Sequence, residues 1–424
     1  MSSRREFLRL SATAGVALLT PLRSPSYTTE PVNFPPQQER MLDDLQHRAV
    51  RYFFEQADLE TGLVRDRARM TGPEARRISS IAATGFGLSA LCVGEARGFL
   101  PTEVARKRVE LTLEHLIQHS PHKNGFYPHF LDLETGTRAW KSEFSSIDTA
   151  WLVCGALHAG EHFSSRHIAS MAHEIYARVD WQWMLNGGTT LSHGWTPEHG
   201  FLPYRWDTYS ELLAMYLLAI GSPTYSIPAA TWDAWKRPVH TEGNLSFIET
   251  DAPLFAHQYS HAWFDFRGRR DRYADYFENS RLATEAHRLR CLELADKYPW
   301  FNQGMWGVTA SDSRKGYLAW GASHRPGAID GTLVPCASAG ALPFMPAECV
   351  TVLENMLEHY GNRCFGRYGF VDAFHPNAAW YDPDVVGIDQ GITVLMAENA
   401  RTGQIWETLS ANPHVAKSFA LVGM

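Results

Sequence analysis

The stretch MLDDLQHRAVRYFF (residues 41–54) sets the pattern from which the fold can be predicted. Its apolar side chains Leu42, Leu45, Ala49 and Phe53 are three or four residues apart, which is the spacing of a helix with one buried face. The same spacing returns further along the chain, so this helix is one of a series.

Segments with helical character recur from one end of the chain to the other. Beyond the first, we expect helices at about 78–97, 109–117, 145–161, 168–179, 209–220, 252–264, 272–297, 346–360 and 387–401. Strand-like alternation is rare and short, and no intervening loop resembles a flexible linker. The sequence therefore predicts an all-α domain of six antiparallel helix pairs in a ring, with long loops forming a cleft at one end.

Composition narrows the functional classes. The 424 residues are 45% hydrophobic, 12% aromatic and 20% charged, which suits a large folded core and excludes disorder. The net charge is −7, and no Lys/Arg cluster alternates with aromatic residues, so we expect no nucleic-acid partner. After the first twenty residues no apolar run approaches the roughly 18 residues of a membrane helix, so we expect no stable membrane association.

The N-terminus resembles a twin-arginine export signal. Arg4 and Arg5 precede Phe7, and a short apolar stretch at 10–19 ends at Pro21. We therefore expect a signal peptide and linker at 1–30, one domain at 31–424, and a periplasmic or secreted protein.

Six cysteines are scattered without any CxxC spacing, which argues against zinc ribbons and redox motifs. A twin-arginine substrate folds before export, in the reducing cytoplasm, so we expect mostly free thiols. They are Cys92, Cys154, Cys291, Cys336, Cys349 and Cys364.

The loops combine aromatic residues with polar side chains that form hydrogen bonds. The stretch WTPEHGFLPYRW (195–206) is typical, and 232–235, 257–267, 306–317 and 368–380 are similar. A pyranose ring presents an apolar face for stacking and a fringe of hydroxyls for polar groups, so this mixture favours a carbohydrate ligand. The alternative is that these aromatics fill the core.

Glycosidic hydrolysis needs one carboxylic acid and one carboxylate, and four residues are candidates. Glu211 precedes an apolar helix, where the helix dipole would lower its pKa, although a general acid needs a raised one. Glu143 lies just before a helix. Asp148 follows Ser145 in a pattern that could also be a capping box.

Asp389 lies between Gly387 and Gly391. These small neighbours could let a ligand approach closely, or they could simply permit tight helix packing.

His257 and His261 are four residues apart and could share a helix face, as metal ligands do. Since no HExxH or HxH pattern supports a metal, we expect sugar contact or buried hydrogen bonding instead. No phosphate loop, nucleophile elbow or recognisable Cys/His pair occurs, so we expect no metal and no cofactor.

Long motifs across nearly the whole mature chain resemble the glycoamylase-like proteins that include bacterial endo-β-1,2-glucanases, glycoside hydrolase family 144. They are SEFSSIDTA (142–150), GWTPEHGFLPYRWDTYSE (194–211), GSPT (221–224), PLFAHQYSHAWFDFRG (253–268), DYFENSRLAT (275–284), WGVTASD (306–312), GRYGFVDAF (366–374) and GIDQG (387–391). The resemblance implies an (α/α)6 toroid and metal-independent, anomer-inverting hydrolysis of β-1,2-glucan.

The resemblance also implies site residues. It places the acid on Glu211 and leaves the base open among Glu143, Asp148 and Asp389. Inversion would need carboxyl groups about 6.5–9.5 Å apart. The expected substrate-binding residues are Trp140, Trp195, Tyr204, Arg205, Trp206, Asp207, His257, Gln258, His261, Trp263, Asp265, Arg267, Asn279, Trp306, Asp312, Tyr368, Phe370 and Asp372.

The leading interpretation is a monomeric hydrolase whose partner is β-1,2-glucan or its oligosaccharides. An exo-acting or transglycosylating enzyme of the same superfamily is the nearest alternative. A polysaccharide lyase on the same toroid would need a basic site for its uronate substrate, which these acidic loops do not offer. A glycan-binding protein without turnover would not need Glu143, Glu211 and Asp389 together.

Overall fold

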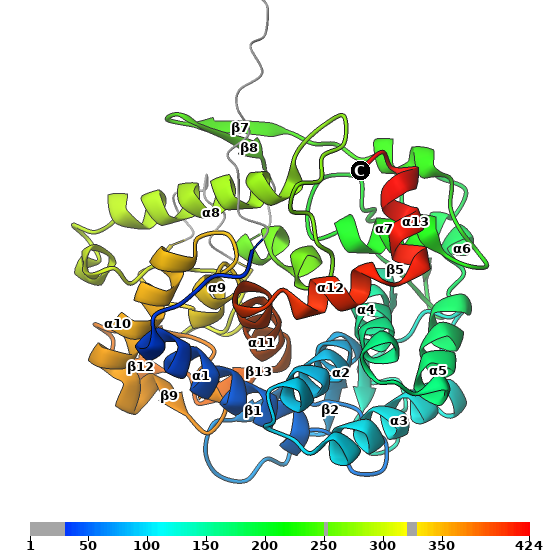
Figure 1. Ribbon diagram of the computed structural model, residues 1–424, viewed down its shortest axis with the longest axis horizontal. Coiled ribbons are helices and arrows are strands. Elements are labelled where there is room, and N and C mark those ends of the chain that lie inside the picture. Colours follow the sequence, from blue (N-terminus) through cyan, green and yellow to red (C-terminus); the bar gives the residue numbers. More distant parts are fainter. Residues whose placement is uncertain (1–29, 250–252, 320–328) are drawn as a thin grey trace, which may run out of the picture.

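Helices dominate the described residues, which are 30–249, 253–319 and 329–424 of the computed structural model (Figure 1). The α-helices are α1 (Pro36–Glu55), α2 (Ile81–Ala96), α3 (Thr102–Gln118), α4 (Ser146–His162), α5 (Arg166–Ala177), α6 (Trp181–Leu185), α7 (Leu213–Gly221), α8 (Tyr276–Glu293), α9 (Pro335–Ala339), α10 (Pro346–Cys364), α11 (Gly387–Arg401), α12 (Gln404–Ser410) and α13 (Pro413–Leu421). The 3-10 helices are η1 (Ala229–Asp233), η2 (Leu254–His257), η3 (Tyr259–Ala262) and η4 (Pro299–Gln303).

The helices form two concentric layers. The inner ring runs α2, α4, α7, η2–η3, α9 and α11, and it closes where α11 packs against α2. The outer layer contains α1, α3, α5, α8, α10 and α13, each packed on inner segments or on its outer neighbours (Figure 1). This confirms the expected (α/α)6 toroid. Because the inner helices are covered on all sides, they are apolar all round, whereas α1 and α5 are amphipathic.

Two glycines let α2 and α4 pack backbone against backbone. A Cβ added at Gly155 would lie 2.0 Å from the carbonyl oxygen of Gly85, and one added at Gly85 would lie 2.4 Å from that of Trp151. Both distances are far below any real contact, so only glycine fits this crossing.

Short strands fasten the loops that precede the inner helices. The strands are β1 (Arg67–Arg69), β2 (Ile78–Ser80), β3 (Phe130–Asp132), β4 (Phe144–Ser145), β5 (Gly194–Thr196), β6 (Gly200–Phe201), β7 (Val239–Glu242), β8 (Leu245–Ile248), β9 (Phe365–Gly366), β10 (Gly369–Phe370), β11 (Phe374–His375), β12 (Trp380–Tyr381) and β13 (Asp384–Val386). All pairs are antiparallel: β2 pairs with β3, β4 with β5 and β5 with β6, while β1 pairs with β13.

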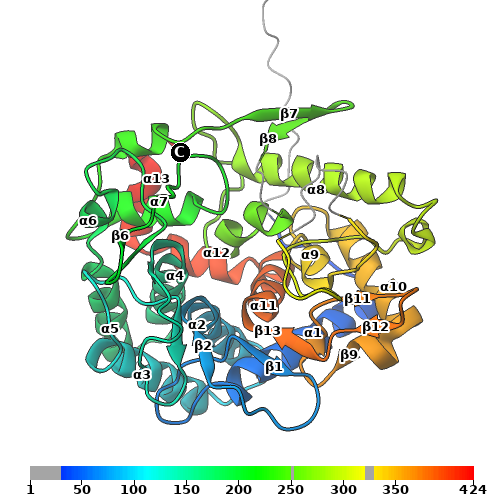
Figure 2. The same cartoon turned by 180° about the vertical axis from the view of Figure 1, so that it is seen from behind.

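These pairings gather the loops at one end of the ring. The loops before α2, α4, α7 and α11 contribute β1–β2, β3–β4, β5–β6 and β13, so each is bonded to the loop of a neighbouring inner helix. Figure 2 shows β1, β2 and β13 together near α2 and α11. We call this end, where the inner helices begin, the loop end.

Most predicted helices are present, and one is wrong. The segment predicted at 252–264 forms two 3-10 turns, η2 and η3, in its described part. Its backbone groups bond to other elements: the carbonyl of His261 accepts from the Trp406 indole at 2.6 Å, and that of Ala262 from Asn399 at 2.8 Å. Tertiary hydrogen bonds therefore replace the helical ones.

The remaining sequence expectations concern thiols and the N-terminus. The six cysteines are buried and free, as expected. No helix within the described ranges is both long and apolar enough to cross a membrane. The predicted export signal lies outside the described residues.

Candidate active site

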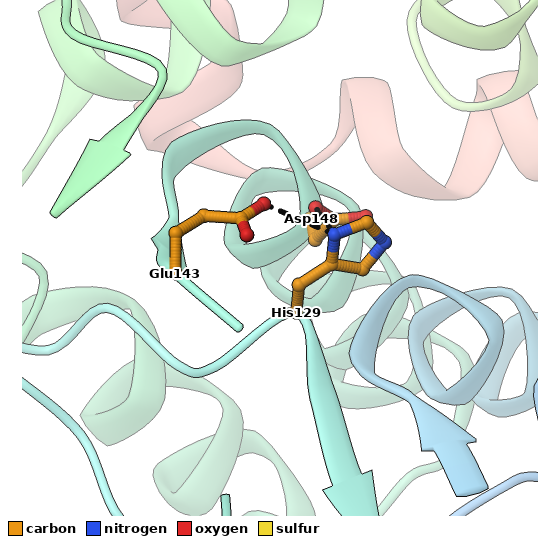
Figure 3. Close-up of side chains that lie close together, drawn as sticks. All are labelled: His129, Glu143 and Asp148. Carbon is orange, nitrogen blue, oxygen red and sulfur yellow. Dashed lines mark hydrogen bonds and ion pairs between the residues drawn. The ribbon is translucent and has the colours of Figure 1, made fainter. Parts of the chain in front are cut away.

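Three side chains meet at the loop end beside the start of α4 (Figure 3). The Nδ1 atom of His129 lies 3.0 Å from Oε1 of Glu143 and 3.7 Å from Oδ2 of Asp148. His129 immediately precedes β3, Glu143 immediately precedes β4, and Asp148 lies in the first turn of α4. The backbone N–H of His129 donates to the carbonyl of Glu143 at 2.9 Å, which aligns the two side chains.

The three side chains shift one another's pKa values. Burial alone would lower the pKa of His129, but the Asp148 and Glu143 charges outweigh it and raise that pKa to about 9. Burial would raise the pKa of Glu143, yet the hydrogen bond with His129 lowers it overall. At neutral pH the site therefore holds a histidine cation against an ionised Glu143.

Asp148 serves both roles considered from the sequence. Its backbone N–H donates to Oγ of Ser145 at 3.3 Å, which caps α4, and the same hydroxyl donates to Oδ2 of Asp148 at 2.5 Å. Burial raises the pKa of Asp148. Capping therefore holds the Asp148 carboxyl in place beside His129.

Glu211 lies in the turn before α7 rather than inside the helix. The Ser260 hydroxyl of η3 donates to the Glu211 carbonyl at 2.6 Å and accepts from the backbone N–H of Ala214 at 3.0 Å, which pins the turn to the ring. Burial, with a further contribution from the charge of Asp148, raises the pKa of Glu211 to about 7. Burial thus outweighs the helix dipole, and Glu211 can hold a proton near neutral pH.

Asp389 is enclosed at the start of α11. It is 3% exposed, and the Tyr259 hydroxyl donates to its Oδ1 at 3.3 Å. Burial raises the pKa of both Asp389 and its neighbour Asp372. The flanking glycine Gly391 serves packing, because a Cβ there would lie 2.4 Å from the ring of Phe86.

A second acidic group lies nearby. Asp312, Asp382 and Asp384 bring carboxylate oxygens within 4.8 Å of one another, as do the ligand atoms of the His129 group. Either group has atom types that could ligate a metal ion. However, Arg67 pairs with Asp312 at 2.7 Å and Arg76 with Asp384 at 2.5 Å, so these carboxylates already have cationic partners.

The predicted sugar contacts divide by exposure. Trp140 and Tyr204 are 69% and 67% exposed, Asp207 is exposed, and Trp195 and Asp312 are half-buried. These five side chains are accessible to a ligand. All five come from loops that precede inner helices.

Arg205, although half-buried, is committed to structure. Its guanidinium donates to the carbonyl of Leu185 at 2.5 Å and to the carbonyl and hydroxyl of Thr190. It therefore closes the loop between α6 and β5.

Ten other residues that the sequence predicts as sugar contacts are buried. Trp263, for example, donates to Oγ of Ser89 on α2 at 2.8 Å, and Tyr209 contacts Nδ1 of His257 at 3.2 Å. The ten residues are Trp206, His257, Gln258, His261, Trp263, Asn279, Trp306, Tyr368, Phe370 and Asp372.

Asp265 and Arg267, which the sequence also predicts as sugar contacts, lie at the opposite end of the ring. They pair at 2.9 Å, and the guanidinium of Arg267 lies 4.2 Å from the Trp406 ring, beyond the end of α11. Since α11 is 15 residues long, about 22 Å separates its two ends. This pair therefore contributes to packing away from Asp389.

The two histidines considered as metal ligands are engaged elsewhere. Nε2 of His261 lies 3.0 Å from the Ser280 hydroxyl, and His257 contacts Tyr209. Burial lowers the pKa of each imidazole to about 3, so both are neutral. Buried hydrogen bonding, one of the two expected roles, describes them.

His129 is the site residue that the sequence did not reveal. It lies 14 positions before Glu143 with no motif around it. The bridge between Pro128 and Phe144 and the neighbouring backbone hydrogen bonds bring the two segments together. The aromatic residues around His129 at 126–130 were the available signal in the sequence. They do not indicate that Glu143 is the partner of His129.

Six inner helical segments inside an outer helical layer, with carboxyl groups collected at one end, define a protein of the (α/α)6 toroid class. Residues 203–413 match the Glycoamylase family, described as "Putative glucoamylase". The chain belongs to this glycoamylase-like family, as its motifs indicated.

Relatives with described activities are β-1,2-glucan hydrolases. An exo β-1,2-glucooligosaccharide sophorohydrolase of Parabacteroides distasonis is 26% identical, and the match covers 92% of this chain but only 59% of that protein. An endo-β-1,2-glucanase from Chitinophaga pinensis, solved with sophorotriose and glucose, is 27% identical, with a TM-score of 0.83 over 91% of this chain and 98% of that one.

A β-1,2-glucanase structure from Parabacteroides distasonis supports the fold. It is 24% identical, with a TM-score of 0.85 over 92% of this chain and 61% of that one. The toroid is thus shared at low sequence identity.

Proposed function

We propose that this chain is a glycoside hydrolase that cleaves β-1,2-glucan or β-1,2-gluco-oligosaccharides by a metal-independent, inverting acid/base mechanism. The observation that carries the proposal is a pair of glutamates before inner helices whose pKa values shift in opposite directions: burial raises the pKa of Glu211 to about 7, and His129, 3.0 Å from Glu143, lowers the pKa of Glu143. Hydrolysis of a glycosidic bond requires one acid and one base of this kind. The activities of the relatives support the substrate class.

In the proposed reaction Glu211 donates its proton to the glycosidic oxygen as the bond to the anomeric carbon breaks. Glu143 accepts a proton from a water molecule, whose oxygen bonds to that carbon from the opposite face. The products are a shortened chain and a sugar with inverted anomeric configuration. Exchange with solvent returns the proton from Glu143 to Glu211.

Glu143 is the preferred base among the three candidates because a water molecule can reach it. Its side chain is 28% exposed, against 12% for Asp148, whose Oδ2 also accepts from Ser145. Asp389 is 3% exposed and bonded to Tyr259. We infer that Asp148 and Asp389 act through charge and positioning.

We further propose endo action. The endo-β-1,2-glucanase from Chitinophaga pinensis, which matches 91% of this chain with a TM-score of 0.83, supports this mode of action. Loops that close one end of a binding site are a common way to restrict an enzyme to chain ends. Exo action and transglycosylation remain the alternative outcomes of the assay below.

We propose a periplasmic or secreted location from the Arg4–Arg5 signal. A fusion of residues 1–30 to a reporter that is active only after export would test it. Replacing both arginines with lysine should retain the reporter in the cytoplasm, and export that is unaffected would contradict the proposal.

Product chromatography on linear β-1,2-glucan tests the function, with β-1,3-, β-1,4- and α-1,4-glucans as substrate controls and Glu211→Gln as the enzyme control. A ladder of β-1,2-oligosaccharides, absent with the variant, is expected. A single short product would indicate exo action, and larger products would indicate transfer. Unsaturated products that absorb ultraviolet light would support a lyase, and binding without any product a glycan-binding protein.

A further inference from the structure

Trp140 is an exposed tryptophan on a strained backbone. Its side chain is 69% exposed, yet Trp140 and Lys141 have φ angles of 52° and 53°. Two successive non-glycine residues in the left-handed region are energetically unfavourable, and such strain concentrates at functional sites. Most of this large aromatic ring is presented to solvent, where a ligand can reach it.

An ion-pair clamp holds this strained loop. The guanidinium of Arg138 donates to the carbonyls of Ser142 and Lys141, each at 2.5 Å, and to both carboxylate oxygens of Glu198 at 2.9 and 3.0 Å. Glu198 belongs to the turn that joins β5 and β6. We call this pair the Arg138–Glu198 clamp, and it locks the loop before β4 to the β5–β6 hairpin.

The Phe130 ring separates the Trp140 ring from the proposed catalytic group. The Trp140 ring meets the Phe130 ring edge to face, with 5.2 Å between centroids, and Phe130 stacks on His129 at 3.9 Å and 15°. His129 in turn bonds Glu143 at 3.0 Å. A continuous set of rings therefore connects Trp140 to the carboxylate, and a sugar unit adjoining the cleaved bond would come within its reach.

We propose that Trp140 is a stacking platform for one glucosyl unit next to the cleaved bond, held in position by the Arg138–Glu198 clamp. The inference rests on the proposed function. A neutral glucan offers no charge for recognition, so an apolar ring surface is the appropriate partner for the C–H face of a pyranose. Trp140 contacts the substrate directly. The Arg138–Glu198 clamp contributes to binding only by holding Trp140 in position.

Steady-state kinetics on linear β-1,2-glucan and calorimetric binding in the Glu211→Gln background test this inference. Trp140→Ala should raise KM and Kd about fivefold or more while kcat changes less than about twofold, and Trp140→Phe should recover most of the loss. Glu198→Gln should raise KM to a smaller extent. Tyr225→Ala, at another exposed aromatic (43%), is the matched control and should match the wild type.

Melting temperatures distinguish a local effect from misfolding. All four variants should melt within a few degrees of the wild type, because the substituted groups lie at the surface. Unchanged KM and Kd for Trp140→Ala, in a wild-type background that cleaves β-1,2-glucan, would overturn the platform alone. A wild type that neither binds nor cleaves β-1,2-glucan would overturn the proposed function and the platform with it.

Discussion

Glu211 and Glu143 are the same residue type with opposite protonation behaviour. Burial raises the pKa of Glu211 to about 7, whereas the hydrogen bond with His129 overcomes the effect of burial and lowers the pKa of Glu143. The difference comes from the surroundings of each residue, since His129 lowers the pKa of Glu143, whereas burial and the charge of Asp148 raise that of Glu211. Roles as acid and base therefore follow from surroundings, not from residue type.

Replacing Glu211 with Gln should abolish turnover. The amide keeps the shape of the side chain but has no acidic proton to donate, so kcat should fall about 10²–10⁴-fold. Stopped assays on β-1,2-glucan with circular dichroism of both proteins would measure this. Activity within a factor of two of wild type would remove Glu211 from the acid role.

His129→Gln should shift the acidic limb of the pH–kcat/KM profile to higher pH. Without the histidine cation the pKa of Glu143 rises, so the base becomes ionised only at higher pH. The alkaline limb, which Glu211 sets near its pKa of about 7, should move less. An acidic limb identical to that of the wild type would show that His129 does not act on the base.

The pH dependence of protein stability should also reveal the raised pKa of His129. Its pKa of about 9 lies above the ordinary value of 6.5, so the folded state binds the proton more tightly than the unfolded chain does. Its contribution is therefore complete below about pH 6.5 and is lost as pH rises through 9. Denaturant titrations between pH 6 and 10 should show a steeper loss in the wild type than in His129→Gln.

At the scale of elements, the packing of α2 against α4 limits the sequence most severely. A methyl group at Gly155 has no space, because it would lie 2.0 Å from the Gly85 carbonyl. Backbone atoms cannot give way as a flexible side chain can, so the two helices would have to separate.

Gly155→Ala should lower the free energy of unfolding by about 3 kcal/mol. Gly361→Ala in α10 is the matched control, since its Cβ would meet the nearest atom at an ordinary 3.7 Å. That control should be neutral or stabilising by up to about 1 kcal/mol, because alanine favours helix. Urea unfolding of both variants measures the difference, and equal stabilities would contradict the backbone contact.

The element that periodicity failed to describe is η2–η3. Apolar and polar residues at 252–264 suit a helix, but Gln258 donates to the carbonyl of Ala337 at 2.8 Å and Ser260 bridges to the Glu211 turn. A regular helix would point these groups elsewhere. Helical pattern was therefore a correct guide to burial there and a wrong guide to backbone conformation.

At the scale of the whole molecule, the closed ring of helices brings the site residues together. Glu143 and Asp148 come from the start of α4, Glu211 from the start of α7 and Asp389 from the start of α11. Because these inner helices all begin at the loop end, carboxyl groups more than 200 residues apart share one region. The candidate site is consequently a property of the closed ring.

The proposed geometry predicts an inverted product. If Glu143 activates a water molecule, as proposed, that water attacks the anomeric carbon from the face opposite the leaving group, so β-1,2-glucan should release the α-anomer first. Proton NMR of the anomeric region during the first minutes of hydrolysis measures this. Initial formation of the β-anomer would show retention and would make Glu143 a nucleophile.

The sequence alone determined the helical class and the family. Helical periodicity and long motifs depend on residues that are neighbours along the chain, so both can be recognised in a single sequence. It also identified Glu211, Glu143, Asp148 and Asp389 as candidates, since motifs preserve residue type and spacing. It could not separate Trp140, which is exposed, from Trp263, which is buried, because residue type alone does not specify burial.

Tertiary structure alone decided which groups act on which. The 3.0 Å contact of His129 with Glu143 and the burial that raises the pKa of Glu211 depend on strands and helices that meet only when the ring closes. Electrostatic interactions depend on distance in space and on exclusion of water, and neither is written in residue order.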